Sequence, residues 1–199
     1  MRKVGIYGGT FSPPHIGHVE AARAFLRAVA LDELIIIPTF TPPHKAYSGQ
    51  VSADDRLGMC ELAFSKLPKT SVSDLEIRRG GKSYTYLTLE ELSSSDVELY
   101  LLCGTDMFIT LDEWKNAERI FELAHICYLR RENDLNTETL IEQKKAKYIT
   151  EYSARITAIS HEVIEVSSTE LRDVVSSGRN SELIPKDVFE FIERRGLYR

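Results

Sequence analysis

The sequence lacks the features that mark membrane-spanning, secreted and nucleic-acid-binding proteins. No apolar run approaches the roughly 20 residues that a helix needs to cross a bilayer, and the first apolar stretch breaks at Gly8, so we expect no signal peptide. No run of Lys and Arg exceeds two residues, and the formal net charge is −5. A chain of this charge has no general attraction to nucleic acid or to an anionic membrane. We therefore expect a cytoplasmic protein that binds neither.

Cysteine is scarce. Cys60, Cys103 and Cys127 are odd in number, far apart and set among apolar neighbours, which argues against a disulfide framework or a structural zinc site and predicts core packing. The chain also lacks an internal repeat and any Pro/Gly/Ser-rich stretch or charge block that would separate domains. Its 199 residues are therefore expected to form a single domain, residues 1–199.

Short β-rich runs alternate with amphipathic helical stretches along the chain, which predicts an α/β fold. We expect a Rossmann-like, doubly wound parallel sheet with helices on both faces. The runs Leu34–Ile37 and Leu99–Leu102 are apolar without alternation, as in central strands buried on both faces. The predicted strands are Lys3–Tyr7, Glu33–Ile37, Ser71–Ile77, Val97–Cys103, His125–Leu129 and Arg155–Ile159. The predicted helices are Gly17–Ala30, Ala53–Lys66, Thr85–Ser93, Asn136–Glu151, Thr169–Ser177 and Lys186–Arg195.

The segment Gly8–His18 is the most informative motif, because it follows the first predicted strand and leads into the first predicted helix. Its two glycines let the backbone approach a ligand closely, and the free N–H groups at a helix start favour an anion. His15 and His18 are three residues apart and share a helix face if the helix begins near His15. The segment therefore predicts a phosphate site with two histidines directed at one ligand.

Simpler interpretations of this segment remain open. Gly8-Gly9 alone is often only a turn, and two histidines three apart are often only part of a helix surface. A metal pair is disfavoured, because the helical zinc motif needs histidines four apart with a Glu beside the first. The segment is neither a P-loop nor a dinucleotide fingerprint, since it lacks the Lys-Ser/Thr of the first and the third spaced glycine of the second.

Three further polar motifs follow predicted strands: Pro38–Lys45, Gly104–Asp106 and Ser167–Thr169. In such sheets ligands bind beyond the carboxyl ends of the strands, so the four motifs predict one shared site. Lys45 offers a point charge to a phosphate, or is a solvated loop lysine. Asp106 accepts hydrogen bonds from sugar hydroxyls, or caps a helix.

The remaining candidates also have two interpretations each. Ser167 and Glu170 form an ordinary capping box, yet the same helix start offers Ser168, Thr169 and Arg172 to an anion. Trp114, the only tryptophan, lies in so polar a stretch that we expect its ring at the surface or in a pocket, available to stack on a flat ligand, and not in the core. The segment Ser83–Tyr86 is also consistent with a plain helix start capped by Ser83 or Thr85.

Taken together, these motifs resemble the nicotinate-nucleotide adenylyltransferase family of nucleotidyltransferases, and the likeness runs nearly end to end. It includes His-x-Gly-His at 15–18, Pro-Pro-His-Lys at 42–45, Ser-Tyr-Thr-Tyr at 83–86 and Ser-Ser-Thr-x-x-Arg at 167–172. Two departures are Ser12, where the family commonly has Asp, and Arg130-Arg131-Glu132, where many members have Arg-Pro-Gly.

The resemblance implies a role for each candidate residue. The catalytic residues would be His15, His18, Lys45 and Arg172, and the acceptor-binding residues would be His44, Thr85 and Trp114. ATP would be bound by Gly8, Gly9, Thr10, Phe11, Gly104, Asp106, Ser168 and Thr169, with no residue serving as a metal ligand.

The implied reaction transfers the adenylyl group of ATP to nicotinate mononucleotide, giving nicotinate adenine dinucleotide and pyrophosphate in NAD biosynthesis. The attacking phosphate is already anionic, so no general base is required. Mg²⁺ would arrive bound mainly to ATP phosphates and water, since the sequence shows no carboxylate cluster. The alternatives are an adenylyltransferase for nicotinamide mononucleotide or phosphopantetheine, and a nucleotide-binding sensor without turnover. The sequence leaves open whether the protein forms a homo-oligomer.

Overall fold

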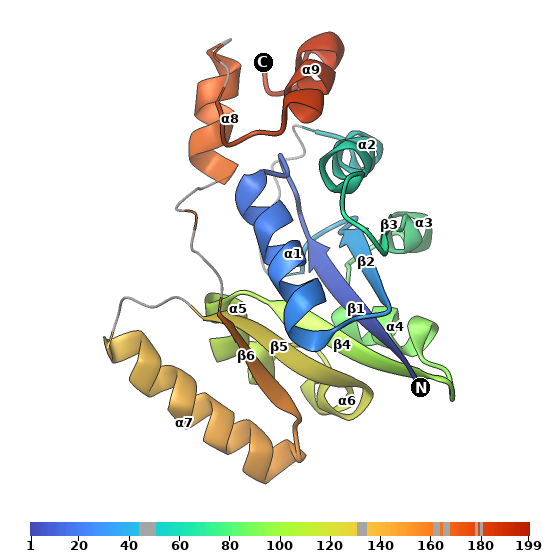
Figure 1. Ribbon diagram of the computed structural model, residues 1–199, viewed down its shortest axis with the longest axis vertical. Coiled ribbons are helices and arrows are strands. Elements are labelled where there is room, and N and C mark those ends of the chain that lie inside the picture. The colour runs from blue at the N-terminus through green and yellow to red at the C-terminus, as the bar shows by residue number, and fades with distance from the viewer. Residues whose placement is uncertain (44–50, 131–134, 161–163, 165–167, 178, 180) are drawn as a thin grey trace.

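A computed structural model describes the protein except for residues 44–50, 131–134, 161–163, 165–167, 178 and 180. Six strands form one sheet in the order β3-β2-β1-β4-β5-β6, and every neighbouring pair is parallel (Figure 1). This is the order of a doubly wound sheet, in which the direction of winding reverses between β1 and β4. The strands are β1 (Arg2–Gly9), β2 (Glu33–Pro38), β3 (Thr70–Val72), β4 (Val97–Cys103), β5 (Ala124–Arg130) and β6 (Ile156–Ser160).

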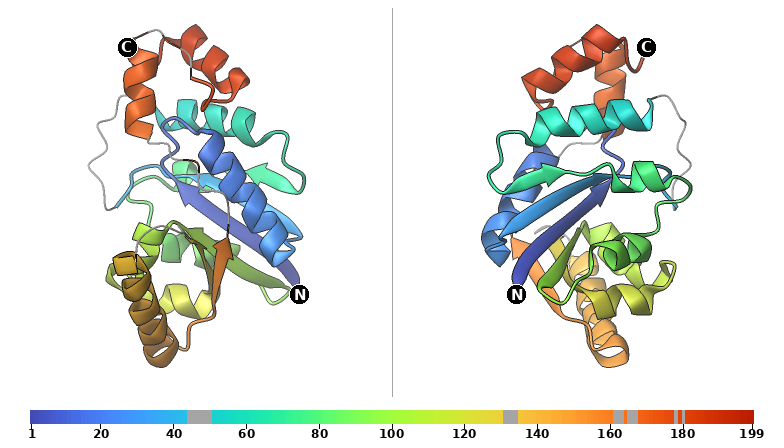
Figure 2. Two further views of the ribbon diagram at one scale, coloured as in Figure 1. Left: turned by 60° about the vertical axis from the view of Figure 1, so that its left-hand side comes forward. Right: turned by 90° about the vertical axis from the view of Figure 1, so that its right-hand side faces the viewer.

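Helices cover both faces of the sheet, so the predicted fold class is confirmed. In Figure 2, the first helix and the long helix after β5 lie on opposite sides of the sheet. The helices are α1 (Ile16–Val29), α2 (Ala53–Phe64), α3 (Leu75–Arg79), α4 (Thr85–Leu92), α5 (Thr105–Ile109), a 3₁₀ turn η1 (Leu111–Glu113), α6 (Ala117–Leu123), α7 (Leu135–Tyr152), α8 (Ser168–Ser176) and α9 (Lys186–Arg195).

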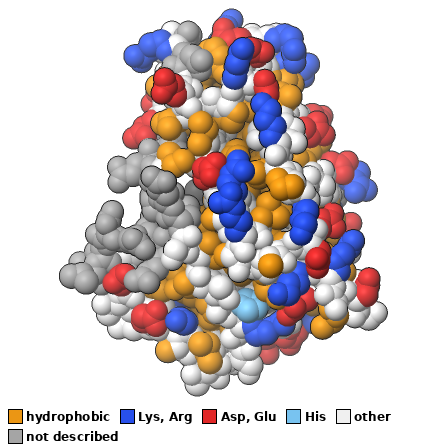
Figure 3. Space-filling model, viewed as in Figure 1, with side chains coloured by type: hydrophobic (Ala, Val, Ile, Leu, Met, Phe, Trp, Pro, Cys, Tyr) orange, Lys and Arg blue, Asp and Glu red, His pale blue; other side chains and the backbone are white. Residues whose placement is uncertain are grey.

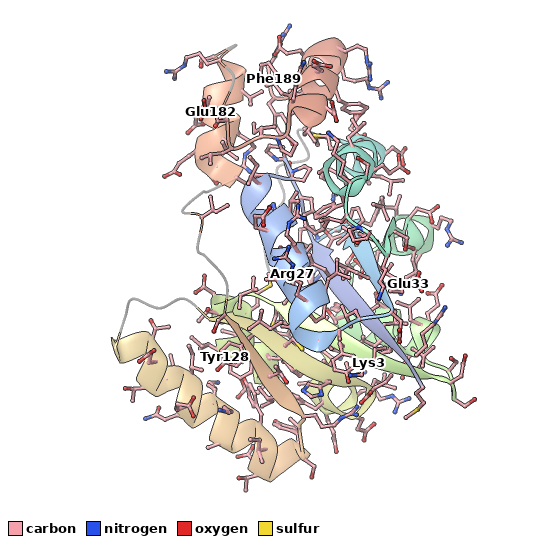
Figure 4. All side chains as sticks on the ribbon, viewed as in Figure 1. Lys3, Arg27, Glu33, Tyr128, Glu182 and Phe189 are labelled. Atoms are coloured by element: carbon pink, nitrogen blue, oxygen red, sulfur yellow. The ribbon has the colours of Figure 1, made fainter. Side chains whose placement is uncertain are left out.

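The two faces carry two separate hydrophobic cores. Alternate residues of β4 divide between them: Tyr100 and Leu102 join the core under α1, α2, α8 and α9, whereas Leu101 joins the core under α4 to α7. Phe189 of α9 packs against the first core, and Tyr128 of β5 lies in the second (Figure 4). The central strands are thus buried on both faces, as their unbroken apolar runs predict.

The six predicted helices are all present, and their bounds differ from the predicted ones by at most two residues. Five of the six predicted strands are also present. Ser52 caps α2 by accepting the Asp55 backbone N–H at 3.0 Å, and Gly196 ends α9 with φ +62°, as expected of a C-terminal glycine. The proposed cap Ser167 lies outside the described residues. The three cysteines are buried and free, as predicted.

The prediction of a strand at Ser71–Ile77 is wrong in its second half. β3 ends at Val72, and α3 begins at Leu75. The Ser73 hydroxyl accepts the Leu75 backbone N–H at 3.3 Å, and such local bonds compete with strand pairing. Leu75 and Glu76 are both buried, which a strand with one covered face does not allow for adjacent residues. The error matters, because α3 contributes to the site described below.

Charged side chains of both signs are interspersed over the face of the molecule shown in Figure 3. Binding of an anionic ligand must therefore depend on a local group of donors and not on a surface of one sign. In the part of the chain that the structure describes, no helix combines the length and the apolar character that a membrane span requires.

Candidate active site

A pocket of about 510 Å³ opens where the winding of the sheet reverses. The pairing between β1 and β4 ends at Ile6 and Leu101, so the residues that follow on each strand separate and line a cleft. The motifs that follow β1, β2 and β4 and the start of α8 all reach this pocket, as the strand-end argument predicts. Its polar and glycine lining comprises Tyr7, Gly8, Gly9, Thr10, Ser12, His18, Thr39, Glu76, Ser83, Thr85, Thr88, Cys103, Gly104, Trp114, Ser168, Thr169 and Arg172.

The loop after β1 is held in a strained conformation. Phe11 has φ +48°, in the left-handed region that non-glycine residues rarely adopt, and its buried ring packs edge-on against Tyr7 and Phe64. A Cβ on Gly9 would lie 2.9 Å from the Phe11 ring, so Gly9 makes room for this ring. A Cβ on Gly8 would meet only the Ile37 carbonyl oxygen, at 4.0 Å, so its open space belongs to the pocket.

A buried arginine fixes the same loop from behind. Arg56 of α2 is 0% exposed and donates to the carbonyl oxygens of Thr10 at 2.9 Å and Phe40 at 3.1 Å. A buried guanidinium is tolerated when hydrogen bonds compensate its charge, and here carbonyl groups from two strand-end loops accept from its two terminal nitrogens. Arg56 therefore ties the loops after β1 and β2 together at the mouth of the pocket.

The two predicted histidines lie together at the start of α1. His15 is the residue before the helix, and its ring stacks on that of His18 with 3.6 Å between ring centroids. Phe11 packs edge-on against His18 from another side, at 5.1 Å. His18 lines the pocket, whereas His15 is buried behind it. The prediction that both share one face is confirmed, but in this structure only His18 lines the pocket.

The hydrogen bonds define how His18 meets a ligand. Its Nδ1 accepts the His15 backbone N–H at 3.2 Å, so the proton of the neutral ring lies on Nε2. Burial, with the neighbouring His15 as a second cause, holds the pKa of His18 well below its usual range, and burial lowers the pKa of His15 to about 4. Both rings are thus neutral near pH 7, and His18 presents an Nε2–H donor.

Arg172 links α8 to the loop after β1. One guanidinium nitrogen donates to the Ser12 carbonyl oxygen at 2.9 Å and the other to the Thr169 hydroxyl at 2.8 Å. The Ser12 hydroxyl lies 3.0 Å from the Tyr198 hydroxyl near the end of the chain. Ser12 stands where the family commonly has Asp, and here it connects the loop after β1 to Tyr198 and Arg172.

The opposite end of the pocket is built around the start of α4. Thr85 is the first residue of this eight-residue helix, and no side chain caps it. The alternative interpretation, a helix start capped by Ser83 or Thr85, is not met: the Ser83 hydroxyl instead accepts the Phe40 backbone N–H at 2.9 Å. The first N–H groups of a helix have no partner within it, so those at Thr85 are suited to an anionic group.

Two further residues complete this end. Trp114 follows η1, lines the pocket and is only partly buried, as the sequence predicts, but it also packs against the second hydrophobic core. Asp112, two residues earlier, accepts from Lys144 at 2.8 Å and Lys147 at 2.8 Å, which anchors η1 to α7. Glu76 of α3 is a buried carboxyl group in the pocket wall.

The structure brings most of the predicted site residues to one pocket. Eleven of the fifteen line it, from five separate segments of the chain. His15 lies behind His18, and the exposed Asp106 lies in the first turn of α5, beside the lining residue Gly104 but outside the lining itself. His44 and Lys45, like the departure at residues 131–132, lie outside the described residues.

Sequence reasoning missed Arg56, Glu76 and Tyr198. Arg56 was detectable in principle, because it falls among apolar positions of an otherwise amphipathic helix. Glu76 was hidden by the wrong strand prediction around it. Tyr198 had no local signal, since its contact with Ser12 joins residues 186 positions apart.

Comparison with known proteins agrees with this geometry. A family model described as cytidylyltransferase-like matches residues 6–174. The chain is 37% identical to a probable nicotinate-nucleotide adenylyltransferase of Desulfatibacillum aliphaticivorans, over 98% of this chain and 99% of that protein. It is also 37% identical to the corresponding protein of Lachnoclostridium phytofermentans, over the whole of both chains.

Solved structures show the same fold. The nicotinic acid mononucleotide adenylyltransferase of Plasmodium falciparum complexed with NaAD matches with a TM-score of 0.76 at 16% identity, covering 100% of this chain and 98% of that one. The same enzyme complexed with APC matches with a TM-score of 0.73. At this identity the likeness concerns the fold alone.

Proposed function

The chain belongs to the cytidylyltransferase-like family and to the nicotinate-nucleotide adenylyltransferases, and from this premise we propose that it transfers the adenylyl group of ATP to nicotinate mononucleotide. A phosphate oxygen of the mononucleotide attacks the α-phosphorus of ATP. The new P–O bond forms as the bond from the α-phosphorus to the bridging oxygen breaks, and pyrophosphate leaves. The product is nicotinate adenine dinucleotide, an intermediate of NAD biosynthesis.

One observation carries the proposal: neutral His18 and Arg172 line the same pocket as the start of α4 and Trp114. The first pair is suited to a polyphosphate, and the second to a flat ring with an anionic substituent. A pocket that holds both kinds of group side by side can align an acceptor phosphate with the α-phosphorus. Such alignment is the main requirement of phosphoryl transfer.

His18 stabilises the transition state as a donor and not as a base. The acceptor phosphate is already an anion, so no proton need be removed from it. The Nε2–H of His18 offers a preorganised hydrogen bond to oxygens on which charge develops. His15 contributes by positioning, since its backbone N–H and its stacked ring orient His18. We place Arg172, Ser168 and Thr169 at the β- and γ-phosphates.

The remaining predicted contacts stay part of the proposal. Lys45 and His44 serve the phosphates and the acceptor, respectively, and Gly104 with Asp106 meets the adenosine. Mg²⁺ neutralises charge on the phosphates when it is bound there. A metal ion carried by ATP and water needs no protein cage, and among the described residues no group of three or more His, Cys, Asp and Glu side chains offers one.

The test is a comparison of acceptors. Pyrophosphate release from ATP and Mg²⁺ is measured with nicotinate mononucleotide, nicotinamide mononucleotide or phosphopantetheine. We expect a nicotinate preference of at least about 10²-fold in kcat/KM over nicotinamide, on the order of 3 kcal/mol, because a carboxamide would point donors at the N–H groups of α4. Equal efficiencies for the two mononucleotides would favour a dual-specificity enzyme. ATP binding without turnover would favour a sensor.

A further inference from the structure

Glu76 is the only carboxyl group among the described residues that line the pocket. It is 5% exposed and belongs to the same end of the pocket as Ser83, Thr85 and Thr88, where the proposed function places the acceptor ring. Neither the phosphate contacts nor the transfer step uses this group. A buried acid in the wall of a site that should receive another acid requires an explanation.

The two oxygens of Glu76 have different surroundings. Oε1 accepts the Thr88 hydroxyl at 2.6 Å and lies 3.8 Å from the Arg79 guanidinium. Oε2 is buried and has no hydrogen-bond partner among the described residues. Arg79 in turn donates to the Thr88 hydroxyl at 2.7 Å, so Thr88 links the guanidinium to Oε1. Oε2 is thus the atom on which a proton can be held.

The groups that face Glu76 come from three segments. Arg79 lies on α3, the same helix as Glu76. Thr88 lies on α4, and Ser83 lies on the segment before α4. Burial raises the pKa of the Glu76 carboxyl, while the hydroxyl groups of Thr88 and Ser83 and the charge of Arg79 act in the opposite direction. Arg79 is itself shared with Glu91 of α4, at 3.4 Å, which weakens its hold on Glu76. The ionised form of Glu76 is thus poorly compensated.

We propose that Glu76 is a specificity-determining residue that takes up a proton on Oε2 when an acceptor with a ring carboxylate binds. The inference rests on the proposed function, which brings that carboxylate to the same pocket wall. Two carboxylates in one water-poor site do not both stay ionised, so one of them binds a proton from solvent. A ring carboxamide carries no charge, so it binds without changing the protonation of Glu76.

This difference makes acceptor choice depend on pH. The complex with nicotinate mononucleotide needs one proton that the complex with nicotinamide mononucleotide does not. Above the pKa of Glu76 in the free enzyme, the nicotinate-to-nicotinamide ratio of binding constants therefore falls by up to about tenfold for each pH unit. Below that pKa the ratio is constant, because Glu76 already carries the proton. The two acceptors share the same phosphate, so its titration cancels in the ratio.

Calorimetry measures the proton directly. Each mononucleotide is titrated into the enzyme in the presence of a non-cleavable ATP analogue, in buffers of different ionisation enthalpy. We expect nicotinate mononucleotide to bind with up to about one more proton than nicotinamide mononucleotide, and this excess to vanish in Glu76→Gln, a neutral isostere. Glu91→Gln is the matched control, because it removes the other carboxylate beside Arg79 from an exposed position and should keep the excess.

The outcomes separate this inference from the proposed function. Equal proton uptake with both acceptors at every pH tested in the wild-type enzyme overturns the role of Glu76, as does an excess that persists in a folded Glu76→Gln variant. If melting shows that this variant is unfolded, the wild-type comparison of the two acceptors still decides. The proposed function fails on a different result, namely no dinucleotide from either acceptor with ATP.

Discussion

The two ends of the pocket are assembled in different ways. The phosphate end joins the loop after β1 to α8 and to the chain terminus, through the Ser12 contacts with Arg172 and Tyr198. The acceptor end comes mainly from one continuous stretch, residues 76–88, with Trp114 added from just after η1. Two phosphate-end contacts thus span 160 and 186 residues, whereas the Glu76–Thr88 contact spans 12.

The ends also differ in charge. Arg172 is a cation at the phosphate end, and the two histidines beside it are neutral. A buried carboxyl group lies at the acceptor end. A triphosphate carries enough charge, together with its metal ion, to be held by neutral N–H donors and one guanidinium. To distinguish nicotinate mononucleotide from nicotinamide mononucleotide, the pocket needs a wall whose hydrogen-bonding groups suit only one of the two.

The most damaging change to the phosphate end is His18→Ala. Removing one preorganised donor to the transition state should lower kcat by roughly 10²- to 10³-fold, with a folded protein and little change in acceptor KM. Steady-state kinetics beside a melting curve measure this. His18→Gln, which keeps an N–H near the Nε2 position, should recover part of the loss. Turnover close to that of the wild type would remove His18 from the proposed role.

Arg172→Ala should affect ATP and spare the acceptor, which sharpens the contrast between the ends. We expect about 10- to 30-fold weaker ATP binding from the loss of a charge-assisted pair of contacts, and less than about threefold for the mononucleotide. Arg172→Lys should rescue only partly. Arg179→Ala, an exposed arginine just beyond α8, is the matched control in separate titrations of the two substrates. An equal loss for both substrates would mean that Arg172 is structural.

Trp114→Ala tests the acceptor end alone. Loss of a stacking surface should raise KM by about tenfold for both mononucleotides, since an aromatic face interacts with either ring. KM for ATP and most of the nicotinate-to-nicotinamide ratio should stay unchanged. Lys115→Ala, at the exposed neighbouring position, controls for disturbance of the segment. A collapse of the ratio in Trp114→Ala would place discrimination on the ring and not on the start of α4.

Tyr198→Phe should have the smallest effect. It removes one buried hydrogen bond to Ser12 and should lower the free energy of unfolding by about 1 kcal/mol. Because Ser12 also binds Arg172, KM for ATP should rise by no more than about fivefold, while acceptor KM stays constant. Urea unfolding and kinetics measure the two effects. A rise confined to acceptor KM would contradict the division of the pocket into two ends.

Much of the fold was predictable because its signals are local. The unbroken apolar runs of β2 and β4 indicated buried parallel strands, and the cap residues Ser52 and Gly196 marked helix ends. The sequence predicted a doubly wound parallel sheet but not the order of its strands, since periodicity does not say which strands pair. The one large error, at residues 73–77, arose where hydrogen bonds from Ser73 and burial of adjacent residues overrode the strand pattern.

The sequence by itself determined the chemistry of the site: Gly8–His18 at a strand end, Arg172 at a helix start and Trp114 in a polar stretch. Those signals depend on residue types and spacing of a few positions, which local geometry converts into shared faces and free N–H groups. Tertiary structure alone decided that His15 is buried behind His18, that Ser12 meets Tyr198, and that Oε2 of Glu76 has no described partner. Each of these depends on burial and on contacts between distant segments, which only the folded chain brings together.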